Sequence, residues 1–115
     1  MAAVPYKFTT TASTNLQPVR AGQSANFKGI SMANVATAMY VKLYWFTPTS
    51  ASTAPTVGTT VPNLTMGFAA SVNEKIDWGD GVTGNGQLWL AVTAAAADSD
   101  NAVAAAGAVV TILVE

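Results

Sequence analysis

Short runs of alternating hydrophobic and polar residues recur along the whole chain, separated by Gly, Pro, Asn and clusters of Thr and Ser. Successive side chains of a β-strand point to opposite faces, so this period of two predicts strands. The predicted strands lie at 4–11, 16–20, 24–32, 36–47, 61–69, 71–78, 87–93 and 108–115. About eight short strands at this spacing favour an all-β antiparallel fold, either a sandwich or a barrel.

The strongest pattern lies at 36–47, where two faces separate cleanly. One face carries Met39, Val41, Leu43 and Trp45 and is expected to belong to the core. The other face carries Tyr40, Lys42, Tyr44 and Phe46. The last run, 108–115, is apolar on both faces, which predicts a buried central strand.

The connections carry clear turn signals. Ala21-Gly22 and Gly79-Asp80-Gly81 predict turns, and a Pro-, Thr- and Ser-rich stretch at 47–60 predicts a long loop. Residues 94–106 have helix propensity, but an interior Asp-Ser-Asp-Asn cluster favours a loop with one helical turn after Asp100.

Residues 1–20 place isolated apolar side chains in a polar stretch, namely Val4, Tyr6, Phe8, Leu16 and Val19. That is enough for adding a strand to a neighbouring subunit and too little for a separate core. Pro5 and Pro18 suit an edge or extended position. We therefore expect an extended N-terminal arm or, as the alternative, an ordinary edge strand, followed by one sandwich domain at 21–115.

The chain of 115 residues is unusually poor in charge. Asp, Glu, Lys and Arg make up 10% of it, against roughly 25% in an average soluble domain. A neutral surface promotes association, which points to a component of an assembly. The net charge is −1 and the five basic residues are scattered, so a nucleic-acid partner is not expected.

Targeting signals are not expected either. There is no apolar run of the ~20 residues that a membrane span needs, and the first residues lack the charged and apolar regions of a secretory signal. The absence of Cys leaves the redox compartment open. These features predict a protein made in the cytosol, or assembled there into a particle released by lysis.

The chain contains no His and no Cys, which excludes Ser-His-Asp triads, Cys-His pairs and ordinary zinc sites. Asp77 with Asp80, and Asp98 with Asp100, are more typical of solvated turns than of a glycosidase pair. A calcium loop starting at Asp98 would need Gly and Glu at positions occupied by Val103 and Val109. The glycine-rich segment 79–86 lacks the Lys of a phosphate-binding loop. We therefore expect no enzyme, metal or cofactor.

The aromatic residues are more informative. Tyr40, Tyr44 and Phe46 share the second face of 36–47, and Trp89 faces away from Leu88 and Leu90. If these faces point outward, they form an exposed patch that suits a protein interface or, by stacking, a sugar ring. The alternative is that a second layer covers them.

Several segments together resemble a group of small tailed-phage virion proteins. The resemblance starts at Tyr40-Val-Lys-Leu-Tyr44, continues at 54–62 (Ala-Pro-Thr-Val-Gly-Thr-Thr-Val-Pro), and includes the glycine-containing turn at 79–86, Ala91-Val-Thr-Ala94 and Ala-Val-Ala-Ala-Ala-Gly at 102–107. It covers roughly residues 24–115. Many members have Asn and Lys where this chain has Trp45 and Phe46, which makes the face more apolar here.

The resemblance implies a jelly-roll-like β-sandwich of about eight strands that decorates a capsid or belongs to a head fibre or tail appendage. We expect a capsid decoration (cement) protein, located on the virion and assembled in the host cytoplasm. It would form a homotrimer and bridge neighbouring major capsid subunits. The expected contact residues are Val4, Tyr6, Phe8, Leu16, Val19, Tyr40, Tyr44, Phe46 and Trp89. The alternative is a carbohydrate- or receptor-binding module that stacks a sugar on Trp89, Tyr40 or Tyr44.

Overall fold

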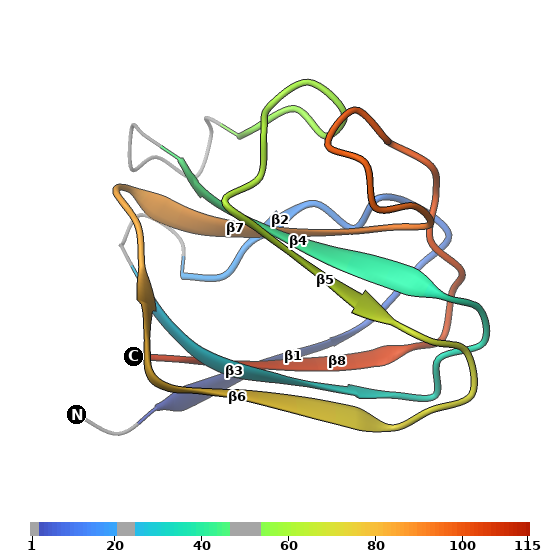
Figure 1. The fold of residues 1–115 in the computed structure, drawn as a ribbon, viewed down its shortest axis with the longest axis horizontal. Coiled ribbons are helices and arrows are strands. Elements are labelled where there is room, and N and C mark those ends of the chain that lie inside the picture. The colour runs from blue at the N-terminus through green and yellow to red at the C-terminus, as the bar shows by residue number, and fades with distance from the viewer. Residues whose placement is uncertain (1–2, 21–24, 47–53) are drawn as a thin grey trace.

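The computed structural model describes residues 3–20, 25–46 and 54–115 (Figure 1). Within these ranges the chain forms strands and loops and no helix. The strands are β1 (Val4–Thr9), β2 (Gln17–Pro18), β3 (Asn26–Ala33), β4 (Met39–Phe46), β5 (Leu64–Phe68), β6 (Glu74–Thr83), β7 (Gln87–Thr93) and β8 (Val109–Val114). Every pairing between these strands is antiparallel. The predicted all-β antiparallel fold is confirmed.

The strands form two sheets of four. Sheet A has the order β1-β8-β3-β6, and sheet B has the order β2-β7-β4-β5. The two sheets lie one above the other, as the lower and upper layers of Figure 1, with the core between them. This arrangement is a β-sandwich, one of the two architectures that the pattern favours. In sequence, β1 pairs with β8, β2 with β7, β3 with β6 and β4 with β5, so the chain resembles one long hairpin rolled into two layers.

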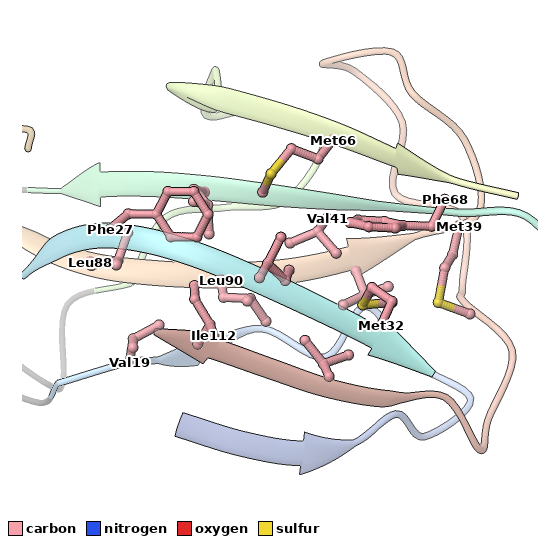
Figure 2. Close-up of a cluster of buried hydrophobic side chains, with 14 of the residues drawn as sticks. Val19, Phe27, Met32, Met39, Val41, Met66, Phe68, Leu88, Leu90 and Ile112 are labelled. Atoms are coloured by element: carbon pink, nitrogen blue, oxygen red, sulfur yellow. The ribbon is translucent and has the colours of Figure 1, made fainter. Parts of the chain in front are cut away.

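The core follows the predicted alternation. Figure 2 shows Val41 and Met39 of β4 among Leu90, Ile112 and Phe27, which come from strands of both sheets. Trp45 also lies in this cluster, and its indole Nε1 donates a hydrogen bond to the carbonyl oxygen of Ala25 at 2.9 Å. The expectation that this face of β4 belongs to the core is therefore correct. The other faces of β4 and β7 lie outside this core and are described below.

The predicted turn at Gly79-Asp80-Gly81 is wrong, because these residues lie inside β6. On β3, Phe27 pairs with Val82 and Gly29 pairs with Asp77, so the segment 78–81 bulges out of the sheet. Both glycines have a positive φ, 57° and 96°, a conformation that side chains disfavour. The two glycines therefore allow a β-bulge and not a turn, and β6 continues after the bulge.

Residues 4–9 form an edge strand of sheet A, not a projecting arm. β1 pairs along its whole length with β8, and β2 pairs with β7 in the other sheet. Pro5, which has no N–H group to donate, suits this edge position. Residues 1–20 thus contribute one strand to each layer, apart from residues 1–2, which lie outside the described residues.

The loop at 94–106 contains no helical turn after Asp100, contrary to expectation. A turn precedes Asp100 instead, where its N–H group donates to the carbonyl oxygen of Ala97 at 2.9 Å. The Asp100 carboxylate accepts a hydrogen bond from the Ala102 N–H group at 2.7 Å, and this local bond competes with a helix. The predicted turn at Ala21-Gly22 and residues 47–53 of the predicted long loop lie outside the described residues.

Candidate interaction surfaces

The outer face of sheet B is covered by the chain's own loops. Tyr44, Trp89 and Ala91 form a second buried cluster, separate from the main core. Leu16, which precedes β2, and Val57, from the loop before β5, pack against it. Figure 1 shows the loops before β5 and after β7 on the side of sheet B that faces away from sheet A. Loops, and not another sheet, cover the aromatic side chains of this face.

Lys42 fastens one of these loops to β4. Its side chain is fully buried, and its ammonium group donates hydrogen bonds to the carbonyl oxygens of Ala97 and Asp100, at 2.7 and 3.0 Å. A buried ammonium group is costly unless it is hydrogen-bonded, so these two bonds fix the loop to the sheet. Lys42 is thus a structural residue of the covered face.

The two covering loops also contact each other and hold their own shape. A side chain at Gly58, where φ is 92°, would meet Asn101 and the carbonyl oxygen of Ser99. Within the first loop, the N–H groups of Thr59 and Thr60 donate to the carbonyl oxygen of Thr56. Glycine is therefore required where the loops meet, and the pair forms a continuous cover.

Two buried polar atoms under this cover have no hydrogen-bond partner in the described part of the chain. They are the hydroxyl group of Tyr44 and the indole Nε1 of Trp89, two residues that face each other across β4 and β7. Burial raises the pKa of Tyr44 above its ordinary value of 10.0, and the negative charge of Asp98 raises it further. Burial and the charge of Asp98 thus favour the neutral form of Tyr44. Its hydroxyl group and the indole N–H group of Trp89 are both hydrogen-bond donors without a partner in the described residues.

The expectation of an exposed aromatic patch is wrong for two of its four residues. Tyr44 and Trp89 are 1% and 4% exposed, so neither presents a free surface. Tyr40 and Phe46 are partly buried on the same side of β4. The Tyr40 ring lies over Gly67 of the neighbouring strand β5, where an added Cβ would come within 2.9 Å of the ring. The pattern of β4 correctly predicts which residues share this face, but it cannot show that distant loops cover it.

The five N-terminal residues expected to contact a partner also differ in their burial. Val19 belongs to the main core, so the expectation that it contacts a partner is wrong. Tyr6 and Phe8 are partly buried against that core, and the Tyr6 hydroxyl donates a hydrogen bond to Gln17 Oε1 at 2.5 Å. Leu16 is partly buried under the loops of sheet B. Val4, which is 55% exposed, is the one of these five that stays largely open to solvent.

The outer face of sheet A is bare by contrast. Across its four strands, the register places Lys7, Thr111, Ser31 and Lys75 in one row. The next row holds Pro5, Leu113, Gly29 and Asp77. Among the described residues, no segment crosses over this face in Figure 1. Small, hydroxyl and lysine side chains therefore meet solvent directly.

A groove of about 270 Å³ crosses this face and is here named the sheet A groove. Leu113, Gly29 and Thr111 line its middle, and Lys28, Lys75 and Asp77 line it towards β6. Gly29 is fixed there by close approach of the backbone, because an added Cβ would lie 2.8 Å from the carbonyl oxygen of Ile76. The bulge of β6 stands beside the groove, and its Trp78 is 36% exposed while its ring contacts that of Phe27 at a centroid distance of 6.0 Å.

Sequence reasoning missed the residues of this groove, although one signal was present. The run 108–115 is apolar on both faces and correctly predicts a central strand, since β8 lies between β1 and β3. Its inward side chains are buried, but Val109, Thr111 and Leu113 on the other face are only partly buried. The expected burial of both faces of this strand is therefore wrong, because no described segment covers its outer face.

The carboxylates of Asp77 and Asp100 accept local hydrogen bonds from the backbone. Asp77 accepts a hydrogen bond from the Gly79 N–H group at 3.0 Å, as Asp100 does from Ala102. In the described ranges there is no group of three or more His, Cys, Asp or Glu side chains that could hold a metal ion. The same ranges contain no helix long and apolar enough to cross a membrane.

Comparison of the chain with protein-family models, with curated proteins and with solved structures finds no match.

Proposed function

We propose that this chain is a phage capsid decoration protein, which binds the assembled head and bridges neighbouring major capsid subunits. The observation that carries the proposal is the unequal covering of the two outer faces. Sheet B is closed by loops, whereas sheet A presents a groove lined by apolar and lysine side chains. A bare sheet face with partly buried apolar positions is typical of a surface that another protein covers.

The strand order supports the jelly-roll-like fold that the resemblance implies. Four antiparallel pairs, β1 with β8, β2 with β7, β3 with β6 and β4 with β5, are divided between two facing sheets. Eight strands in two such layers are the ordinary composition of a jelly roll, an architecture common in viral capsid proteins. This support concerns architecture, and the resemblance supplies the link to a virion.

The mechanism is adhesive. A protein that binds the closed shell but not loose subunits stabilises the shell by mass action. A homotrimer at a point where capsomers meet multiplies weak contacts, because the second and third sites bind at a high effective concentration. The low charge content of the chain, 10%, fits a surface that neighbouring subunits cover. The proposed location is the capsid surface, reached in the host cytoplasm.

The contact residues of this proposal differ from those expected from sequence. Sheet A contributes Leu113, Lys28 and Lys75 around its groove, and exposed Val4 lies at the edge of the same sheet. Tyr40 and Phe46 stay available in part at sheet B. The carbohydrate-binding alternative has weaker support, since two of its three stacking platforms, Tyr44 and Trp89, are covered.

Sedimentation of purified protein with isolated heads tests the proposal. We expect saturable binding to assembled heads of the phage that encodes the chain, weak binding to unassembled major capsid protein, and none to host polysaccharide. Imaging of saturated heads should then show the protein at regular positions. Binding to polysaccharide or cells without binding to heads would overturn the proposal in favour of a receptor-binding module.

A further inference from the structure

We infer that the sheet A groove binds an extended acidic segment of the partner, in which acidic and apolar side chains alternate. The inference deepens the proposed function, because it assigns the chemistry of the surface that docks on the shell.

Positive charge is concentrated on the bare face. Lys28 and Lys75 line the groove, and Lys7 lies on the same face opposite Thr111. Asp77 is the one carboxylate among the residues that line it. The lining of the groove therefore carries one net positive charge, although the chain as a whole has a net charge of −1. Such a lining attracts carboxylates and disfavours basic partners.

Negative charge is divided between the two sides of the sandwich, since Glu74, Asp77 and Asp80 belong to β6 and Glu115 follows β8. Asp98 and Asp100 belong to the loop that Lys42 holds over sheet B. The ammonium group of Lys42 is buried with that loop and adds nothing to an exposed positive surface. The groove itself, with two ammonium groups and one carboxylate in its lining, is the place that suits an acidic partner.

The lining of the groove explains why apolar residues should accompany the acidic ones. Gly29 leaves its centre open beside the partly buried apolar side chain of Leu113. An isolated anion would make no use of these apolar atoms, whereas an alternating segment buries its apolar side chains there. Its carboxylates lie on the opposite side of the extended segment, where the long, flexible lysine side chains at the rim reach them.

The direction of the groove favours an extended segment. Its lining residues come from β6, β3 and β8 and end at Ala3, next to β1. Four adjacent strands span about 14 Å from the first to the last, which is the length of about four extended residues.

Fluorescence anisotropy with a labelled peptide of alternating Glu and Val residues tests the inference on the intact protein. We expect binding to this peptide, no comparable binding to the analogue with Gln in place of Glu, and weakening of binding as salt rises. The double variant K28Q/K75Q should weaken binding roughly tenfold at low salt, while K28R/K75R should retain it.

A matched control changes the net charge equally at the other face. T59E/V61E alters two exposed residues of the loop over sheet B and shifts the net charge by −2, as K28Q/K75Q does. We expect it to bind the peptide within about twofold of the wild type. Equal weakening by both double variants, or equal binding of the Glu and Gln peptides by the wild type, would overturn the inference.

Sedimentation with heads separates this inference from the proposed function. If wild-type protein and K28Q/K75Q decorate heads equally well, the assignment of the groove is wrong and the decoration function stands. If wild-type protein binds the acidic peptide but not heads, the groove assignment stands and the decoration function is wrong. Decoration that K28Q/K75Q weakens and T59E/V61E does not supports both.

Discussion

The two outer faces of this sandwich differ in whether other segments of the chain cover them. On sheet B, two loops and the segment before β2 bury Tyr44, Trp89 and Lys42. On sheet A, Leu113 and Thr111 stay partly open beside two lysines of the groove. Aromatic content therefore does not by itself locate an interface, because the large aromatic side chains of sheet B pack against loops of the same chain. We propose that the less conspicuous outer face of sheet A is the one that a partner covers.

The largest expected difference between the faces is in the cost of removing a tryptophan. Trp89→Ala empties the cluster beneath the loops and should lower the free energy of unfolding by about 3–5 kcal/mol. Trp78→Ala removes a partly exposed ring from the sheet A side and should cost about 1 kcal/mol. Urea denaturation followed by circular dichroism measures both, and equal costs would contradict the unequal covering.

The next prediction compares the loss of one lysine side chain on each face. Lys42→Ala leaves the carbonyl oxygens of Ala97 and Asp100 without their donor and removes a buried aliphatic chain, so it should cost about 2–4 kcal/mol. Exposed Lys7 on sheet A should tolerate the same change within about 0.5 kcal/mol. Hydrogen exchange should also become faster in residues 94–103 of Lys42→Ala. Unchanged exchange there would show that Lys42 does not hold the loop.

A smaller effect is expected from removing single tyrosine hydroxyl groups. The Tyr44 hydroxyl is buried without a partner in the described residues, so Tyr44→Phe should be neutral or stabilise the protein by up to about 1 kcal/mol. The Tyr6 hydroxyl donates to Gln17, so Tyr6→Phe should destabilise it by about 1 kcal/mol. Opposite signs in the urea midpoints are the prediction. A clear loss of stability in Tyr44→Phe would mean that its hydroxyl has a partner.

The smallest effect is confined to alkaline pH. Burial, together with Asp98, raises the pKa of Tyr44 above 10.0 in the folded state. Above about pH 10 the unfolded chain therefore loses this proton while the folded chain retains it, and stability falls as pH rises through that window. Urea denaturation between about pH 8 and pH 11 should show a shallower fall in Tyr44→Phe than in the wild type. Identical slopes would contradict the burial of this hydroxyl.

The sequence correctly predicts which residues of a strand share a face, but it does not predict which face other segments cover. The alternation at 39–46 correctly assigns every side chain of β4 to one of two faces. Which face is covered depends on contacts such as Lys42 with Ala97, which are 55 residues apart and leave no periodic signal. The same limit applies to Val19, whose place in the core depends on the packing of both sheets.

Glycine in a sequence also does not distinguish a turn from a bulge. Gly79 and Gly81 indicate a positive φ, and that much is correct, but turns and bulges both use this conformation. Only the pairing of β6 with β3 on both sides of the segment distinguishes them. The groove depends on this pairing too, since Gly29 and Asp77 are partners there. A site built by register between distant strands could not be predicted from either strand alone.

Acetylation of lysines on free and head-bound protein, followed by mass spectrometry, shows whether the bare face of sheet A docks on the shell. We predict that Lys28 and Lys75, which react in the free protein, are protected on decorated heads, while buried Lys42 is unreactive in both states. Equal reaction of Lys28 and Lys75 in the two states, with the protein demonstrably bound, would show that the bare face of sheet A is not the docking surface.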